Sequence, residues 1–536
     1  MVGITVYLWP IASLYAWASY YLVGQPGDAA RSRCLYRDSC WPTEDDFAHL
    51  SSKLTRPLIQ PTTLAQPCYL PGSRSPANDS SGSCSIIAQH WDDGPGDPTM
   101  PAQCSIPTSR RNVPAIGVDA RTVRDVQTAV QFAAQHDLRL VIKNTGHDFL
   151  GRSGGKGSFM IWTHRMKDIS VHDALQPLGA PANEQYDHAI TLGAGVQWEE
   201  AYAAADEADR MIVGGISAGG SVEAAGGWLL GGGHCALSPT YGLGENVLEI
   251  SLVAANGAHI TANAHRHPDI LGRALRGGGG GTYGVVMSVT YRTCLMVPVK
   301  IAYVVATINS SQPTTGVSSD GSSLSHTFIA LIPNVSWEQA NATIVPYLGR
   351  VRALAQEPSV MGGQSEPLMK VTTNTAPYSS FYSVYKAILP TTGAAGRNLE
   401  LGSWLLPRSL SLVTGGAVSR ANPSSTGLNP AWRKTTVHVV VGTTWPDGTS
   451  PRDVERLGQG LERRTAEVRA LARDSGTYFN EASMFGSDVL RTSFGAHRPE
   501  LKVIKESYDP WDTFIVREGV RSEHWDVGFK LRCRLD

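Results

Sequence analysis

The sequence is poor in charge, and its charges cancel. Charged residues make up 17% of the 536 residues, with 46 basic side chains against 47 acidic ones. Binding to nucleic acid or anionic membranes through bulk charge requires a basic excess, so the sequence gives no support for either partner. Hydrophobic residues make up 42%, which excludes a disordered chain. A chain of this length is expected to fold as two or more packed units.

Motifs of several common enzyme classes are also missing. No GxGxxG opens a helix after a first strand and no GxxxxGK[ST] is present, so neither a Rossmann site nor a P-loop is indicated. His259, His265 and His267 lack carboxylates or cysteines at ligand spacing, so no metal is predicted.

The N-terminus has no charged side chain before Asp28. Residues 4–23 are apolar and rich in aromatics, and residues 16–18 form an A-x-A-like cleavage site, although no Lys or Arg precedes them. This pattern predicts a signal peptide over residues 1–18, or an uncleaved anchor of about 20 residues. The alternative is a buried N-terminal helix. We expect a secreted or vesicular protein of the secretory pathway, with the N-terminal segment as its only membrane contact.

Cysteine usage agrees with an oxidising compartment. A Ser/Pro/Gly-rich extension over residues 19–110 holds five of the eight cysteines: Cys34, Cys40, Cys68, Cys84 and Cys104. Disulfides would stabilise such a stretch, with Cys34 to Cys40 the most local candidate, although the connectivity does not follow from sequence. N-x-[ST] sequons, which predict a glycoprotein, occur at Asn78, Asn309, Asn334 and Asn341.

Periodic α/β patterning begins near residue 112. A capping-box pattern predicts a helix over 122–136, and a buried strand over 138–142 leads into a loop of glycines and small polar residues at 144–153. Asn256-Gly257 predicts a type I′ hairpin between strands at 247–255 and 258–261.

A second unit is expected from about residue 297, where longer mixed segments are separated by Ser/Thr/Gly/Pro loops. Ser450 and Pro451 are expected to open a helix that ends near Gly476, with Leu471 on its apolar face. The aromatic-rich tail from Thr477 is expected to pack back on the chain.

Glycines gather in four clusters, at 144–153, 214–227, 231–246 and 276–284. Without a Cβ, backbone N–H groups can closely approach a ligand that is flat or anionic. A dinucleotide has both features.

The order GHDFLGRS, GGxxxGGGHCxLSPxYGLGxNVLE, ALRGGGGGTYGVV and YFNEA resembles the berberine bridge enzyme-like branch of the vanillyl-alcohol oxidase superfamily, in its fungal style. The similarity spans about residues 111–296 and 476–530. It implies an α+β fold: a two-part FAD-binding domain of the p-cresol methylhydroxylase (PCMH) type at 111–296, an antiparallel-sheet substrate domain at 297–475, and a segment at 476–536 that returns to the flavin site.

The resemblance also implies FAD as cofactor and His147 as the residue linked to the flavin 8α carbon; the alternative is a histidine that only hydrogen-bonds a neighbour. Arg152 adds a charge to the loop or lies in solvent. The remaining positions expected to contact the cofactor are Asn144, Thr145, Gly146, Asp148, Gly151, Ser153, Gly226, Gly227, Gly232, Gly233 and Asn480.

A second flavin link is not expected. Relatives that have one carry a cysteine where this chain has Gly219 and Gly220. Cys235, which follows the glycine triplet, is interpreted as a buried packing thiol.

Three residues are candidates for the chemistry. Removal of hydride from carbon is easier once an attached O–H or N–H loses its proton, so a base is required. Tyr478 is the first candidate, provided its pKa is lowered; packing against the flavin ring is the competing role. Glu481 could act as acid or base, and His234 could orient substrate or be structural.

We therefore expect a monomeric FAD-dependent oxidase that passes hydride from a small organic substrate to covalently bound FAD and then to O2, tailoring a fungal secondary metabolite. A carbohydrate oxidase is one alternative. A non-redox isomerase or cyclase on the same flavoprotein scaffold is another. We also expect His147, Tyr478 and Asn480 to converge on one cavity of isoalloxazine size.

Overall fold

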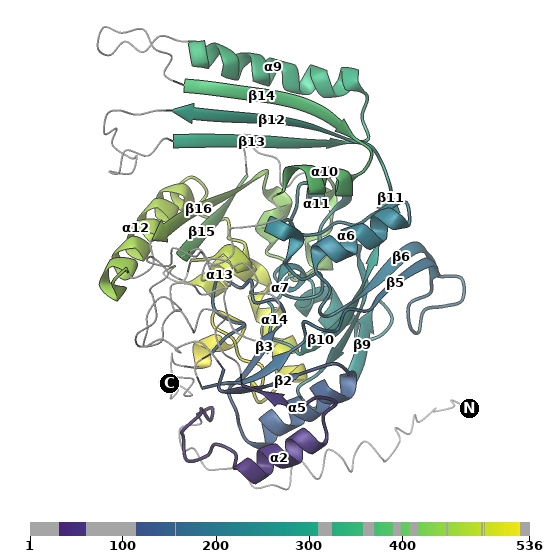
Figure 1. Cartoon of the computed structure of the whole chain (residues 1–536), viewed down its shortest axis with the longest axis vertical. Helices are drawn as coiled ribbons and strands as arrows, with labels where there is room; N and C mark the ends of the chain where they lie inside the picture. Colours follow the sequence, from purple (N-terminus) through teal and green to yellow (C-terminus); the bar gives the residue numbers. More distant parts are fainter. Residues whose placement is uncertain are drawn as a thin grey trace, which may run out of the picture.

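The computed structural model describes residues 32–60, 114–155, 157–308, 324–356, 369–389, 398–407, 416–445, 449–483, 486 and 488–525. The protein has the expected α+β fold, with several antiparallel sheets and one partly parallel sheet (Figure 1). The proposed signal or anchor, most of the Cys-rich extension, and the sequons Asn78 and Asn309 lie outside the described residues, whereas Asn334 and Asn341 are exposed. No helix in the described ranges combines the length and apolarity needed to cross a bilayer.

A small first sheet opens the flavin-binding part. Its strand order is β1-β2-β4-β3, with β2, β4 and β3 parallel and β1 antiparallel. Helix α5 packs against it and begins as predicted, because the Thr122 hydroxyl accepts from the Asp125 N–H while the Asp125 carboxylate accepts from the Thr122 N–H. The bounds are β1 Leu58–Ile59, β2 Ile116–Asp119, α5 Val123–Gln135, β3 Leu140–Lys143 and β4 Phe159–Trp162.

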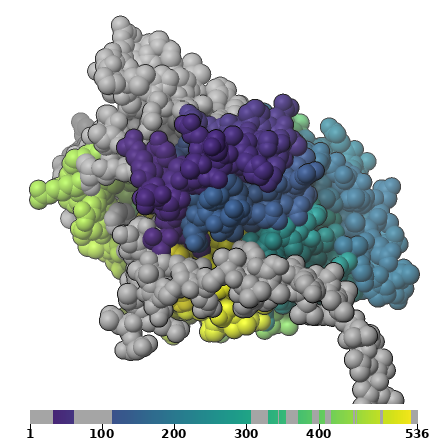
Figure 2. Space-filling view, turned by 90° about the horizontal axis from the view of Figure 1, so that it is seen from below, coloured from purple at the N-terminus to yellow at the C-terminus, as the bar shows by residue number. Residues whose placement is uncertain are grey.

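Residues 32–60 cover this first sheet from outside (Figure 2). Helix α2 (Glu44–Ser52) lies on α5, with the rings of Phe47 and Phe132 5.4 Å apart. The predicted Cys34–Cys40 disulfide is present. The extension is therefore stapled locally and held by aromatic contacts.

A five-stranded antiparallel sheet follows, in the order β5-β6-β10-β8-β9. Its β8–β9 hairpin was predicted, but the predicted type I′ turn is wrong, because Gly257 has φ +78° while Asn256 does not have positive φ. The Gly257 N–H donates to Ala254 O, which is the pattern of a type I turn followed by a left-handed glycine. The bounds are β5 Ile169–Leu175, β6 Tyr186–Gly193, α6 Trp198–Glu207, β7 Arg210–Met211, α7 Gly227–Leu230, α8 Ser238–Tyr241, β8 Val247–Val253, β9 His259–Asn263, β10 Val285–Arg292 and β11 Cys294–Leu295.

The second part contains two more antiparallel sheets. Strands β13-β12-β14 form one, with α9 on its outer side, and β15-β16 form the other, with α12 against it (Figure 1). The bounds are β12 Val299–Ile308, β13 Leu324–Pro333, α9 Trp337–Gln356, β14 Met369–Tyr378, α10 Phe381–Ile388, β15 Asn398–Leu406, α11 Gly416–Arg420, β16 Val437–Trp445 and α12 Pro451–Ala470. Helix α12 begins at its predicted Ser450 cap but ends at Ala470, and Leu471 is 74% exposed instead of packed.

The tail returns to the first part, as the aromatic pattern predicted. It carries α13 (Val489–Phe494) and α14 (Arg498–Tyr508), drawn in yellow beside α7 and β10 in Figure 1. Phe479 and Phe494 are buried in the same core as Leu230, and Phe514 in the core of the first sheet. The returning segment is thus part of the flavin-binding core.

Candidate flavin and substrate site

A cavity that is partly open to solvent lies where the two flavin-domain sheets meet. It is bounded by the ends of β3 and β4, the loop after β6, the start of β10 and two glycine segments. The residues along it are Ile142, Asn144, Gly146, His147, Asp148, Arg152, Ser153, Thr163, Ala194, Glu223, Ala225, Gly226, Gly227, Leu230, Gly280, Gly281, Gly284 and Val286.

The 144–153 loop forms one wall. Gly146 has φ +95° and Gly151 has φ +72°, so the loop folds through conformations that favour glycine. The amide of Asn144 donates to Ala194 O at the end of β6, and Arg152 pairs with Asp148 within the loop. These bonds fix the loop that carries His147.

His147 lies in the cavity wall. A hydrogen bond of 2.8 Å joins its Nε2 to Ser221 Oγ. Burial lowers the pKa of His147 to about 3, so the imidazole is neutral at physiological pH. A neutral, oriented imidazole is the nucleophilic form of this side chain.

The cavity has the features that FAD requires. Asn144 Oδ1, Arg152 Nη1 and Ser153 Oγ are buried polar atoms without a hydrogen-bond partner in the described structure. Glycines face each other across the cavity, because a Cβ on Gly280 would lie 3.4 Å from the Cα of Gly227. Unsatisfied polar atoms beside a glycine-lined slot suit a ligand with a flat ring and phosphates.

Sequence reasoning missed Glu223 and Ser221. The Thr145 hydroxyl donates to Glu223 Oε2 (2.6 Å), and the Gly227 N–H donates to Glu223 Oε1 (2.8 Å). Burial raises the pKa of Glu223, while these donors oppose that rise. Glu223 thus ties the His147 loop to α7. Both residues lie in the glycine cluster 214–227, for which the prediction considered only the glycines.

A chain of hydrogen bonds links the cavity to the returning tail. The Arg152 guanidinium lies 4.1 Å from the Phe479 ring centroid and donates to Asn480 Oδ1 (2.7 Å). Asn480 Nδ2 donates to Gly227 O and to the Tyr478 hydroxyl, both at 2.7 Å. His147 therefore lines the cavity, Asn480 contacts its wall, and Tyr478 lies one contact further out.

Tyr478 does not meet the condition set for a base. Burial and the charge of Glu481 raise its pKa well above the ordinary value, and its hydroxyl donates to Trp228 O (3.2 Å). A phenol in that state remains protonated at neutral pH. Tyr478 therefore does not fit the role of the base, and the candidates are the side chains around it.

Those side chains are His234, His438 and Glu481. The His234 ring lies edge-on to Tyr478 at 4.9 Å and to His438 at 4.8 Å, with Trp432 at 5.6 Å. His438 and Trp432 were not predicted, because they lie in and before β16, where no family motif marks the sequence. Burial lowers the pKa of His438 to about 4.

Some predicted cofactor residues lie outside the cavity. Thr145 is behind it on Glu223, and Gly151 turns the loop. Gly232 and Gly233 are glycines for packing: a Cβ there would lie 2.1 Å from Leu428 Cδ1 and 2.7 Å from the Trp228 ring.

Two expectations about cysteine agree with the geometry. Cys235 is buried in the main core and accepts weakly from the Ser238 hydroxyl. A Cβ on Gly220, one of the two positions to which the resemblance assigns a linking cysteine, would lie 2.3 Å from the Tyr385 oxygen and 2.4 Å from Glu199 Cβ, so this position has no room for a cysteine.

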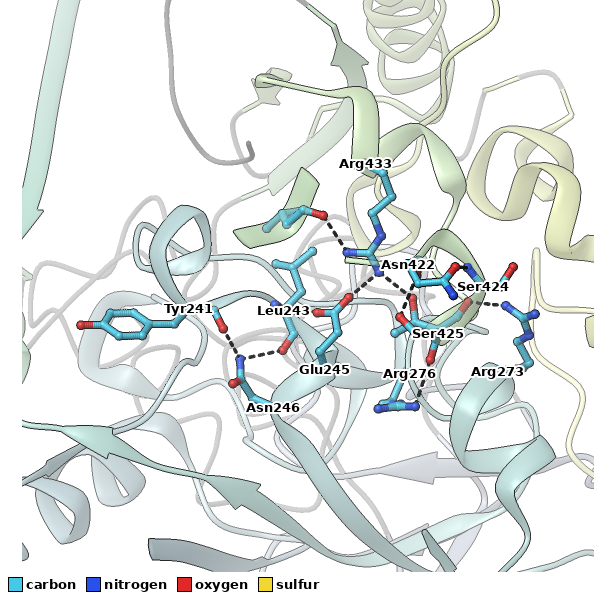
Figure 3. Close-up of polar contacts among 12 residues, drawn as sticks. Tyr241, Leu243, Glu245, Asn246, Arg273, Arg276, Asn422, Ser424, Ser425 and Arg433 are labelled. Atoms are coloured by element: carbon cyan, nitrogen blue, oxygen red, sulfur yellow. Dashed lines mark hydrogen bonds and ion pairs between the residues drawn. The ribbon is translucent and has the colours of Figure 1, made fainter. Parts of the chain in front are cut away.

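Arginines hold residues 416–434 against the flavin-binding part (Figure 3). Arg433 pairs with Glu245 and donates to Val418 O and Thr426 Oγ1. Arg276 donates to Ser425 O. The anchored segment presents Trp432 to the His234 ring.

Comparisons with known proteins agree with this site. The FAD binding domain family matches residues 114–263. An uncharacterized FAD-linked oxidoreductase of Arthroderma benhamiae is 31% identical, over 93% of this chain and 95% of its own length. The VAO-type flavoprotein MtVAO615 of Myceliophthora thermophila C1 has a TM-score of 0.77 at 26% identity, covering 94% of this chain and 100% of that one. Glucooligosaccharide oxidase of Acremonium strictum, with a 6-S-cysteinyl, 8α-N1-histidyl FAD, has a TM-score of 0.59 at 18% identity, covering 76% and 92%.

Fold and site together define an FAD-binding flavoprotein with the PCMH-type architecture of VAO-type proteins. The chain belongs to the FAD-linked oxidoreductases, and it is an enzyme of that family.

Proposed function

We propose that this protein is an oxidase with FAD linked covalently to His147, which passes two electrons from a small organic substrate to O2 and forms H2O2. The observation that carries the proposal is the state of His147: neutral, held by Ser221, and set in the wall of a cavity suited to FAD. Gly220 leaves no space for a cysteine link, so the attachment is single.

Bound FAD supplies the hydride acceptor for this chemistry. The residues around the cavity would hold the cofactor: the backbone of 144–153 and the glycines 226–227 and 280–281 would bind it, and Arg152 would supply a positive charge. Leu230 and Val286 add apolar surface that limits the access of water.

The proposal also covers the substrate class and the cellular location of the protein. The exposed sequons Asn334 and Asn341 and the Cys34–Cys40 disulfide are compatible with passage through the secretory pathway. We retain a fungal secondary metabolite as the proposed substrate.

The first prediction tests the link. His147→Ala removes the nucleophile and keeps the glycine backbone, so the variant should fold and bind FAD that acid releases, while acid-precipitated wild type stays yellow. Intact-protein mass and a peroxidase-coupled assay for H2O2 after photoreduction give the readouts. Wild-type protein that releases all its flavin contradicts the covalent link, and photoreduced enzyme that air does not reoxidise contradicts the oxidase.

A further inference from the structure

Three polar atoms converge beside Tyr478 without bonding one another. His438 Nε2 lies 3.4 Å and His234 Nε2 3.8 Å from the same carboxylate oxygen, Glu481 Oε2. All three atoms lie within 4.8 Å of one another. His438 Nε2 and Glu481 Oε2 are buried and have no hydrogen-bond partner in the described part of the chain.

This spacing suits a fourth atom between them. An oxygen about 2.7–2.9 Å from each of the three would rest just above their plane, at ordinary hydrogen-bond distances. A metal ion at about 2.1 Å would require the side chains to close in. The His438 side chain is 1% exposed, whereas those of His234 and Glu481 are 20% and 21% exposed, so the group is open on one side.

We propose that His234, His438 and Glu481 together bind the hydroxyl group of an alcohol substrate, and that Glu481 accepts its proton as the adjacent carbon gives up hydride. The inference rests on the proposed oxidase function and assigns its substrate class. In the step, the O–H and one C–H bond break and the C–O bond becomes C=O. The hydride carries two electrons to FAD, and the proton goes to Glu481 Oε2.

The charge states fit these roles. Burial opposes ionisation of Glu481, but the two imidazoles beside its carboxylate, those of His234 and His438, hold its pKa below the ordinary value. The carboxylate is therefore ionised and accepts from the hydroxyl, while an imidazole N–H donates to the hydroxyl oxygen. Trp432 and Tyr478 wall the group with rings, which suits an apolar carbon skeleton next to the hydroxyl.

The group is connected to the flavin cavity. Asn480 Nδ2 contacts both Tyr478 and the carbonyl of Gly227, a cavity residue. Other titratable groups that face the site are Arg152, through Asn480, and Glu400 on β15, which accepts from the Ser483 hydroxyl. In this scheme His438 contacts the substrate hydroxyl but not the reacting carbon, and it also helps to keep Glu481 ionised.

The test uses anaerobic bleaching of the intact flavoprotein by a panel of aliphatic and benzylic alcohols, each paired with its methyl ether. Alcohols should bleach the flavin and ethers should not, because only alcohols carry the proton to be removed. With the most active alcohol, Glu481→Gln should slow bleaching by about 10²–10⁴-fold. His438→Gln should shift the acid limb of the bleaching rate to higher pH, since loss of the imidazole lets the pKa of Glu481 rise.

A matched control is His265→Gln, which breaks another His–Glu pair, the 2.9 Å contact with Glu184 on the surface, and should leave the rate unchanged. Bleaching by ethers, failure of every alcohol, or an unchanged rate in Glu481→Gln overturns the inference. A rate that EDTA abolishes and Zn²⁺ restores assigns the three ligands to a metal instead. Reoxidation of photoreduced flavin by air needs no substrate, so it reports on the oxidase function separately.

Discussion

Ser221 is the residue that orients His147. Its hydroxyl is 2.8 Å from His147 Nε2. A nucleophile reacts faster when its ring is held at the reacting atom.

The second prediction is that Ser221→Ala slows covalent attachment of FAD to flavin-free protein by roughly 10-fold or more, with the fold intact. Attachment in the wild type should be independent of pH between 5.5 and 7.5, because the pKa of His147 is near 3 and the imidazole is neutral throughout. Time courses of acid-stable absorbance measure both effects. A rate that rises with pH through 6.5 would mean that His147 is solvated, contrary to this account.

Gly220 excludes the second flavin link by space and by backbone. Its φ of +64° favours glycine, and a Cβ would meet Tyr385 and Glu199. The third prediction is that Gly220→Cys lowers the free energy of unfolding by about 1–3 kcal/mol, the range for overpacking, and adds no thioether to the flavin. Denaturant titration and the mass of the flavin peptide check this. A flavin joined to the side chain at position 220 in this variant would contradict the prediction and would show that the backbone moves.

At the residue scale, the sequence identified those site residues that lie together in one local motif. His147 and the loop 144–153 were found because their residues are contiguous. His438 was missed because it meets Glu481 only after β16 packs beside the returning tail. Tyr478 could act as a base only if its pKa were lowered. Burial and the charge of Glu481 raise that pKa instead, and the sequence alone reveals neither cause.

At the element scale, prediction followed local physics. The Thr122–Asp125 capping box and the Ser450 cap fixed two helix starts, because those bonds are made within four residues. The hairpin turn type and the end of α12 differed from prediction. Both depend on backbone angles that the sequence permits in more than one form. Asn256 is tolerated in either turn, and no glycine between Ala470 and Gly476 marks the end of the helix.

Helix α14 docks through the buried ammonium group of Lys505. Lys505 Nζ pairs with Asp509 and donates to Thr282 O and Phe514 O, both at 2.7 Å. Burial opposes ionisation of Asp509, but the Lys505 charge and two backbone N–H groups lower its pKa. The lysine thereby fastens the returning tail to the glycine segment 276–284.

The fourth prediction is that Lys505→Met lowers the free energy of unfolding by about 3–5 kcal/mol, because it leaves a buried carboxylate unpaired. The double variant Lys505→Met/Asp509→Leu should recover much of that loss. In the wild type, the contribution of Asp509 is present above its ordinary pKa of 3.8 and is lost as pH falls through its lower folded value. Chemical denaturation across pH measures these effects. Equal stability of Lys505→Met and wild type would show that the contacts of Lys505 do not stabilise the fold.

At the scale of the whole molecule, segments distant in sequence form one site. His147, Arg433 and Glu481 come from the flavin part, the second part and the tail. The family resemblance anticipated the return of the tail, and its aromatic composition supported that. The docking of 416–434 could not be anticipated, because its contacts are an arginine to a carboxylate and arginines to carbonyl oxygens, which leave no periodic pattern.

Arg433 makes a buried ion pair among these contacts. Its side chain is 4% exposed and pairs with Glu245, whose other oxygen accepts from the Leu243 N–H (Figure 3). Trp432, next in the chain, packs with Leu243 and Tyr478 in one small core. Because the segment carries that ring to the candidate alcohol site, its attachment should matter to substrate binding more than to flavin attachment.

The fifth prediction is that Arg433→Met speeds amide hydrogen exchange over residues 416–434 and weakens substrate binding, while FAD stays linked. The loss of hydrogen bonds to a charged group should lower the free energy of unfolding by about 1.5–3 kcal/mol. Arg456→Met is the control: it removes an exposed pair with Asp453 on α12 and should cost about 0–1 kcal/mol without changing exchange in the segment. Unchanged exchange in Arg433→Met would show that Arg276 and Leu428 hold the segment alone. A fall in linked flavin would place the effect of Arg433 at the cofactor.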